Sequence, residues 1–158
     1  MLDRKALNHM SRTILVTLAI VAGALPIGAA SADQTAPSHK ARIGSAHGIY
    51  TEQQAAEGAQ IYKRVCAMCH GEALYGTGEI PPLKGRLLYN FRGSSVGALY
   101  DYVSRAMPQM APGSLNPNDN AAIVAFLLRE NDMPAGAKRL PADQATLDAI
   151  PFETVRPH

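Results

Sequence analysis

The chain has 158 residues, of which 18% are charged, and its formal net charge at pH 7 is +2. No basic run or stripe stands out, and this excludes a protein that binds nucleic acid through rows of phosphate contacts. The length suits one domain with one core, preceded by a short targeting segment.

Residues 1–32 have the pattern of a Sec signal peptide. Three basic side chains precede or flank an apolar, uncharged stretch over residues 13–25, and residues 30–32 read Ala-Ser-Ala, which a signal peptidase recognises. The apolar stretch is shorter than the ~20 residues of a comfortable membrane span. We therefore expect cleavage after Ala32 and a periplasmic bacterial protein, with an uncleaved anchor as the alternative. The remaining chain is formally neutral and contains no stretch long enough to span a membrane.

The segment after the signal peptide begins with a leader and then becomes helical. Residues 33–48 are poor in large apolar side chains, which is typical of a flexible leader. Thr51 and Gln54 have the spacing of a capping box, so we predict a helix over residues 52–65. Because glycine weakens a helix by about 1 kcal/mol, Gly58 within it indicates the close approach of another element.

The rest of the chain predicts two further main helices joined by long loops. Four glycines and a pair of prolines make residues 71–93 an irregular loop. Apolar side chains at i, i+3, i+4 and i+7 predict a helix over residues 95–106, and Asn116 is suited to cap a third helix over residues 117–130. A short helix is expected within residues 143–150 of the proline-containing tail.

These patterns predict an all-α fold of three to four short helices and long loops. No alternating strand pattern, internal repeat or nucleotide-binding glycine loop is present in the sequence. We expect one domain over residues 49–132, and a C-terminal extension over residues 133–158 that packs on it or trails from it. Because the apolar faces are thin for so much loop, such a domain needs a metal, a disulfide or a cofactor to complete its core.

Both cysteines of the chain lie in the sequence Cys66-Ala67-Met68-Cys69-His70. A disulfide between them would close a very small loop and add little stability. A thioredoxin-like pair needs a βαβ setting, and a zinc site needs further cysteine or histidine ligands at short spacing. Covalent attachment of a haem uses every part of the motif, because the two thiols bond the vinyl groups and the adjacent histidine ligates iron. We therefore predict one haem c attached through Cys66 and Cys69, with His70 as the proximal ligand.

The iron then needs a ligand on its other face. A buried thioether there would give a six-coordinate, low-spin centre with a raised potential. Met107 and Met110 lie in a proline-containing loop, far enough beyond His70 to pass around the haem edge. We favour Met107 and keep Met110 as the alternative. The methionines and histidines that suit the position less well are Met68, Met133, His39 and His47.

These residues resemble the class I (monohaem) c-type cytochromes from about residue 50 to residue 150. The positions that carry the resemblance are Gly58, Tyr62, the C-A-M-C-H-G motif at 66–71, P-P-L-K-G at 81–85, Met107-Pro108 and Phe126-Leu127. The resemblance implies a cytochrome c fold in which Gly58 lets the first and last helices cross against Phe126. It also implies that the Pro81 carbonyl accepts a hydrogen bond from Nδ1–H of His70, and that Met107, directly before a proline, is the sixth ligand.

Two further segments give a narrower resemblance. Residues 107–115 (MPQMAPGSL) and 131–143 (NDMPAGAKRLPAD) are similar to the small cytochromes and cytochrome domains associated with quinoprotein alcohol dehydrogenases. Met110 departs from this pattern, since members of the family often have glycine at its position. The candidates for holding the haem propionates, in a chain without tryptophan, are Tyr89, Asn90 and Arg92.

With both iron faces filled by protein, the expected function is electron transfer and not catalysis. The resemblance implies a periplasmic one-electron carrier, which passes electrons from a dehydrogenase to a terminal oxidase or another cytochrome. A quinoprotein alcohol dehydrogenase is the candidate donor, and such redox partners meet through small interfaces. The alternatives are a haem subunit of a larger oxidoreductase and, less favoured, a haem peroxidase or gas sensor with a labile sixth ligand.

Overall fold

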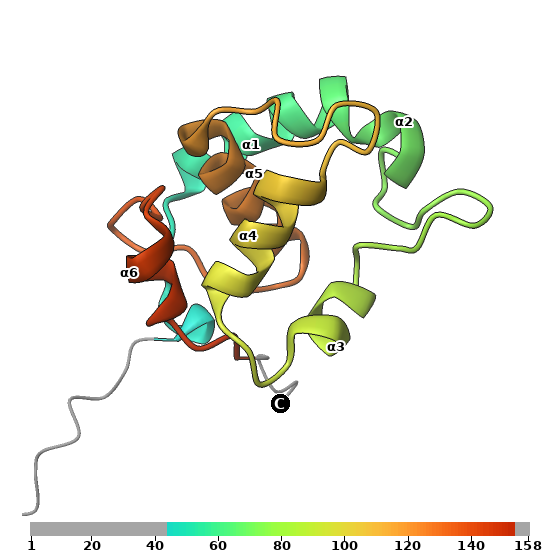
Figure 1. Ribbon diagram of the computed structural model, residues 1–158. Coiled ribbons are helices and arrows are strands. Elements are labelled where there is room, and N and C mark those ends of the chain that lie inside the picture. Colours follow the sequence, from blue (N-terminus) through green and yellow to red (C-terminus); the bar gives the residue numbers. More distant parts are fainter. Residues whose placement is uncertain (1–43, 154–158) are drawn as a thin grey trace, which may run out of the picture. The chain divides into compact units, whose positions relative to one another are not determined.

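A computed structural model of the chain describes residues 44–153, and over this range the structure is built of helices and loops (Figure 1). The predicted signal peptide, most of the leader and His39 lie outside the described residues. The elements are the 3₁₀ turn η1 (Ser45–His47) and the helices α1 (Glu52–Val65), α2 (Ala67–His70), α3 (Arg86–Phe91), α4 (Val96–Ala106), α5 (Pro117–Glu130) and α6 (Gln144–Asp148). Pairing of strand type in the described segment is confined to one isolated bridge, between Ser95 and Pro151. No helix within residues 44–153 is long and apolar enough to cross a membrane.

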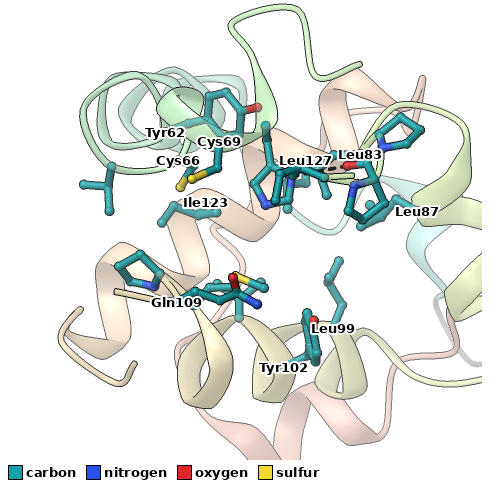
Figure 2. A pocket seen from close by; sticks show the side chains of 18 of the residues that line it. Tyr62, Cys66, Cys69, Leu83, Leu87, Leu99, Tyr102, Gln109, Ile123 and Leu127 are labelled. Atoms are coloured by element: carbon teal, nitrogen blue, oxygen red, sulfur yellow. Dashed lines mark hydrogen bonds between the residues drawn. The ribbon is translucent and has the colours of Figure 1, made fainter. Parts of the chain in front are cut away.

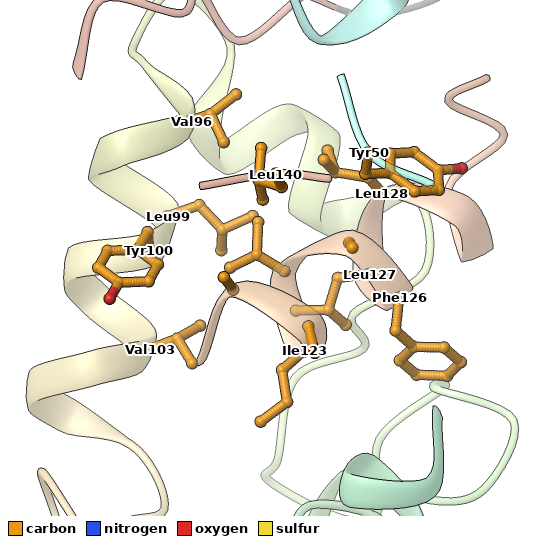
Figure 3. Packing of buried hydrophobic residues seen from close by; sticks show 14 of the residues in the cluster. Tyr50, Val96, Leu99, Tyr100, Val103, Ile123, Phe126, Leu127, Leu128 and Leu140 are labelled. Carbon is orange, nitrogen blue, oxygen red and sulfur yellow. The ribbon is translucent and has the colours of Figure 1, made fainter. Parts of the chain in front are cut away.

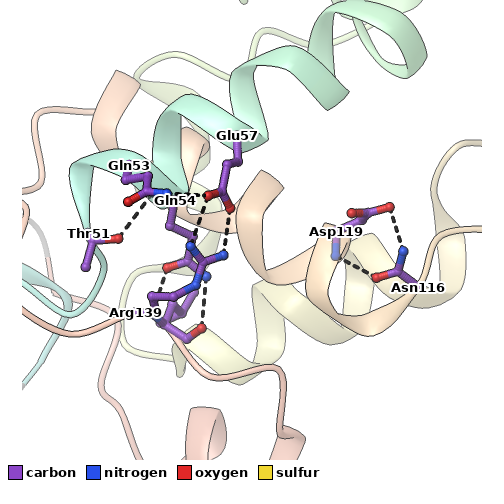
Figure 4. A network of polar contacts seen from close by, with 8 residues as sticks. Thr51, Gln53, Gln54, Glu57, Asn116, Asp119 and Arg139 are labelled. Carbon is purple, nitrogen blue, oxygen red and sulfur yellow. Dashed lines mark hydrogen bonds and ion pairs between the residues drawn. The ribbon is translucent and has the colours of Figure 1, made fainter.

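The all-α class is confirmed, and the three main helices lie where the sequence predicts them. α1 and α5 have the predicted bounds, and α4 begins one residue after the predicted start. Side-chain caps explain these starts, because each cap satisfies a backbone N–H that the helix itself leaves unpaired. Ser95 Oγ accepts from the Ala98 N–H at 3.1 Å, and Asn116 Oδ1 accepts from the Asp119 N–H at 3.0 Å (Figure 4).

The segment 71–93 is not irregular throughout, and this part of the prediction is wrong. Its residues 86–91 form α3, which buries Leu87 and places Leu88 and Phe91 against the core. The apolar side chains at 87, 88 and 91 do have helical spacing. The helix is only six residues long, and the glycines and prolines that precede it dominate the local pattern.

Only one of the two hydrogen bonds of the predicted capping box forms at the start of α1. Thr51 Oγ1 accepts from the Gln54 N–H at 3.2 Å, but the Gln54 side chain does not return to Thr51. It is buried instead against the backbone of Leu140, donating to the carbonyl at 2.9 Å and accepting from the N–H at 2.7 Å. Two buried hydrogen bonds to one distant residue satisfy this amide better than one bond at the helix end.

Helices α1 and α5 cross at Gly58, as the resemblance implies. A Cβ added at Gly58 would overlap the carbonyl oxygen of Ala122 and lie 2.9 Å from Cβ of Phe126. The close approach also brings the rings of Tyr62 and Phe126 together, with centroids 4.9 Å apart. Only glycine permits this backbone contact, which explains why α1 tolerates it in mid-helix.

The core lies where α4 and α5 face each other, and it continues into the C-terminal residues. Figure 3 shows Leu99 and Val103 of α4 beside Ile123 and Leu127 of α5. The buried residues of this cluster are apolar and close-packed, so their burial supplies most of the favourable free energy of folding.

Residues 133–153 pack against the helices. Leu140, Leu147 and Phe152 are at most 2% exposed, and α6 lies against α4. Arg139 forms two hydrogen bonds with Glu57 of α1, at 2.7 and 3.2 Å (Figure 4). The hydrogen bonds from Arg139 hold the pKa of the Glu57 carboxyl below its ordinary value.

We expect Gly58→Ala to destabilise the protein, although alanine is the better helix former. The added methyl group must displace the Ala122 carbonyl, and such overpacking costs about 1–3 kcal/mol, more than the roughly 1 kcal/mol gained in helix propensity. Urea unfolding followed by circular dichroism should show a lower midpoint. Gln60→Ala, at an exposed site of the same helix, is the control and should change stability little. A Gly58→Ala protein as stable as this control would contradict the crossing.

Candidate functional site

The described structure contains an apolar cavity of about 380 Å³. Its walls come from the end of α1, from α2, from residues 80–83, and from α3, α4 and α5. Figure 2 shows Tyr62, Cys66 and Cys69 on one side of it, and Leu99, Tyr102 and Gln109 on the other. The cavity therefore lies between the motif that carries the cysteines and the end of α4 with the loop that follows it.

The short helix α2 places the chemistry of the motif on one wall. Cys66 is its N-cap, and the backbone N–H groups of Cys69 and His70 both donate to the Cys66 carbonyl, at 3.1 and 3.0 Å. Positions i, i+3 and i+4 share one face of a helical turn. Both thiols and the imidazole therefore line the same cavity, as the covalent-attachment interpretation requires.

Hydrogen bonds to the carbonyl groups of the motif hold this turn in place. The Tyr62 hydroxyl donates to the Gly71 carbonyl at 2.7 Å, and the Thr77 hydroxyl donates to the Cys69 carbonyl at 2.7 Å. The Gly76 N–H donates to the His70 carbonyl at 2.9 Å. Three carbonyl groups at the end of α2, those of Cys69, His70 and Gly71, are thus hydrogen-bonded.

The Pro81 carbonyl lies beside the imidazole of His70. Its oxygen is 3.3 Å from Nδ1. Since a carbonyl oxygen can only accept a hydrogen bond, this contact places the ring proton on Nδ1. The lone pair of Nε2 is then free to bind a metal, and a hydrogen bond at Nδ1 strengthens the electron donation from Nε2 to a bound metal.

The properties of the two thiols favour attachment over the other interpretations of the motif. Both cysteines are free. Burial, together with the neighbouring Cys69, raises the pKa of the Cys66 thiol to about 11, whereas a redox-active pair needs a thiol pKa below the ordinary value. Within residues 44–153 no three side chains of the types His, Cys, Asp and Glu come together to hold a metal, so the zinc interpretation lacks its further ligands.

The structure separates the two methionines of the loop after α4. Met107 is the C-cap of α4, its N–H donates to the Val103 carbonyl at 3.2 Å, and its half-buried side chain lines the cavity. Met110 is 79% exposed and does not line it. Met107 is therefore the thioether that the fold presents to the cavity.

The other candidates for the sixth ligand lie away from the cavity. Met68 is 71% exposed, although it stands between the two cysteines, and Met133 is buried in the core outside the cavity wall. His47 pairs with Glu153, with 3.3 Å between Nδ1 and the carboxylate. Among the described residues this leaves Met107 as the sixth-ligand candidate.

Of the three side chains considered for the haem propionates, Asn90 lines the cavity and the other two do not. Tyr89 is 75% exposed and Arg92 is also on the surface. Tyr102 and Gln109 line the cavity as further polar side chains, and the sequence reasoning missed both. Tyr102 lies three residues after Leu99 on α4, a spacing that could have indicated it.

The cavity suits an iron porphyrin. Its volume is within the roughly 300–1,000 Å³ range of ligand pockets, and its wall is mostly apolar with a few polar groups. Two thiols, one imidazole with a free Nε2 and one thioether form the donor set of a covalently attached, six-coordinate haem. Cys66, Cys69 and His70 would hold the group from α2, and Met107 from the end of α4.

The comparison with protein families agrees with this chemistry. Residues 53–127 match the protein family described as cytochrome c oxidase, cbb3-type, subunit III. Among solved structures, a chain of the sulfane dehydrogenase SoxCD from Paracoccus pantotrophus is 27% identical, with a TM-score of 0.43. That match covers 57% of this chain and 54% of the SoxCD chain, so it spans about half of each. No curated protein matches the chain.

Proposed function

Because this chain is a class I c-type cytochrome with one covalently bound haem c, we propose that it carries single electrons between redox proteins of the periplasm. The bound haem supplies reversible one-electron exchange between ferrous and ferric iron. The protein accepts an electron from a reduced dehydrogenase and gives it to an oxidised acceptor, which is a terminal oxidase or another cytochrome.

The observation that supports this proposal most is the presence of one ligand on each side of the cavity. His70 offers Nε2 from α2, and Met107 offers its thioether from the end of α4. If these two side chains held the iron of a bound haem, they would leave no position for a substrate or a gas. The mostly apolar wall would limit the contact of a bound haem with water, which favours the less charged ferrous form and a higher reduction potential.

The donor that we propose is a quinoprotein alcohol dehydrogenase. This rests on the segments 107–115 and 131–143, which resemble the cytochromes associated with such enzymes. We also propose that the signal peptide is cleaved after Ala32 on export, so that the chain meets its partners in the periplasm. The encounters would be brief, through the small interfaces that are typical of electron-transfer complexes.

A second candidate is a haem subunit of a larger oxidoreductase. The family that residues 53–127 match is described as an oxidase subunit, and the same pair of axial ligands would serve electron transfer within a complex. A free carrier and a subunit differ in whether the protein leaves its partner between turnovers.

Purification from the periplasm, followed by spectroscopy and stopped-flow reduction, tests the proposal. We expect a low-spin oxidised protein with the weak red band of an iron–thioether bond, no rapid CO binding when reduced, and fast reduction by a quinoprotein alcohol dehydrogenase supplied with alcohol. Elution alone, at the size of a single chain, supports the free carrier, whereas constant co-elution with a larger subunit supports the second candidate. A high-spin spectrum with rapid CO binding would contradict both.

A further inference from the structure

The side chain of Asn131 joins the end of α5 to the loop that contains Pro81. Asn131 is the C-cap of α5 and is 4% exposed. Its Oδ1 accepts from the Gly85 N–H at 2.7 Å, and its Nδ2 donates to the carbonyls of Leu83 at 3.2 Å and Leu127 at 2.8 Å. One buried amide thus makes one bond to its own helix and two bonds to residues 81–85.

The bond to the Leu83 carbonyl restricts the Pro81 carbonyl through Pro82. The carbonyl carbon of Pro81 is bonded to the ring nitrogen of Pro82, in a planar peptide group. The ring of Pro82 fixes its φ near −65°, which removes one of the two backbone rotations between that peptide group and Leu83. Holding the Leu83 carbonyl therefore narrows the range of directions open to the Pro81 oxygen that faces His70.

Backbone contacts with Leu74 and Gly76 hold residues 81–84 on the side away from Asn131. The carbonyl of Leu74 accepts from the N–H groups of Leu83 and Lys84, at 2.8 and 3.2 Å. A Cβ added at Gly76 would lie 3.0 Å from the carbonyl carbon of Pro81, so the Gly76 backbone stands directly behind it. The Pro81 carbonyl is held between this backbone and the segment that Asn131 ties to α5.

Helix capping alone does not account for this arrangement. A cap needs a bond to a carbonyl of the last turn, and the contact with Leu127 provides it. The two bonds to the loop reach residues 46 and 48 positions away in the sequence. They add nothing to the end of α5, but they fix the segment that supplies the hydrogen-bond partner of His70.

We infer that Asn131 is a positioning residue for His70. It holds residues 81–85 so that the Pro81 oxygen accepts the proton of Nδ1, and this sets how strongly Nε2 donates electrons to the iron. Stronger donation stabilises the ferric form, so Asn131 lowers the reduction potential below the value the centre would otherwise have. The inference rests on the proposed function, because it acts only through a ligated His70.

Asn131→Leu tests this inference, since leucine has a similar size and cannot form hydrogen bonds. In the reduced holoprotein with ¹⁵N-labelled histidine, loss of the anchor should speed hydrogen exchange at Nδ1–H of His70 by about tenfold, the factor expected for one lost hydrogen bond. The midpoint potential should rise. The matched control is Gln54→Leu. It removes another buried amide, which makes two hydrogen bonds to the backbone of Leu140, and neither residue lines the cavity.

The control should lower stability while leaving the exchange rate and the potential at their wild-type values. If Asn131→Leu also leaves both values unchanged, its role is only structural and the inference is wrong. If Asn131→Leu does not yield folded holoprotein, Asn131→Asp replaces it, because aspartate keeps the acceptor for the Gly85 N–H and loses both donors. Gln54→Glu is then the control, with the same two measurements. If the wild-type protein gives no signal of a ligated His70, the proposed function itself is wrong. The wild-type measurement therefore separates failure of the proposed function from failure of the inference about Asn131.

Discussion

Replacing both Cys66 and Cys69 with alanine is expected to abolish covalent haem completely. Each thioether bond needs a thiol, and the chain contains no other cysteine. The double variant should give no haem-stained band on a denaturing gel. It should also fold poorly, because the cofactor would fill the cavity of about 380 Å³ between α2 and α4, and a void of that size removes much of the core packing.

Met68→Ala is the matched control for this loss. Met68 lies between the two cysteines and is 71% exposed, so its removal changes the same motif without removing a bond to the haem. We expect the control to stain as strongly as the wild type. Covalent haem retained in the double cysteine variant would contradict the attachment, whatever the stability of that variant.

Met107→Ala is expected to change the iron centre more than any other single methionine substitution. Without the thioether, the weak red band of the oxidised spectrum should disappear and the reduced protein should bind CO. Axial ligands set haem potentials over a span of roughly 0.8 V, so we expect the midpoint potential to fall by an amount on the order of 0.1 V. Spectroscopy with a CO titration and a redox titration measure the three effects on one preparation.

Met110→Ala tests the alternative ligand in the same loop. Because Met110 is 79% exposed and outside the cavity, this variant should keep the red band, the potential and the resistance to CO. If Met110→Ala opens the iron and Met107→Ala does not, the loop after α4 must rearrange on haem binding, and our ligand assignment is wrong.

The helices that were predictable from the sequence are those with local signals. The helices α1, α4 and α5 each begin at a capping side chain that accepts a hydrogen bond from a backbone N–H. In addition, α4 has apolar side chains at helical spacing along one face. α3 was missed because six residues after a run of glycine and proline give too short a pattern. The second half of the capping box at Gln54 failed because its true partner, Leu140, lies 86 positions away.

In the site, too, features with a local signal could be predicted and those that depend on distant partners could not. The motif from Cys66 to His70 is contiguous, so its chemistry could be predicted from spacing. The structure brings Cys66, Cys69 and His70 to the cavity that Met107 also lines. Asn131 could not be predicted in this way, because the loop residues it binds are 46 and 48 positions away. Thr77, which donates to the Cys69 carbonyl, lies in an irregular loop where no periodic pattern indicates which way a side chain points.

The intact mass of the purified wild-type protein under denaturing conditions tests the central claim most directly. We predict a mass equal to that of the processed polypeptide plus one haem, with the added mass on a peptide that contains Cys66 and Cys69. A correctly exported protein that is colourless, with the mass of the polypeptide alone, would contradict the account.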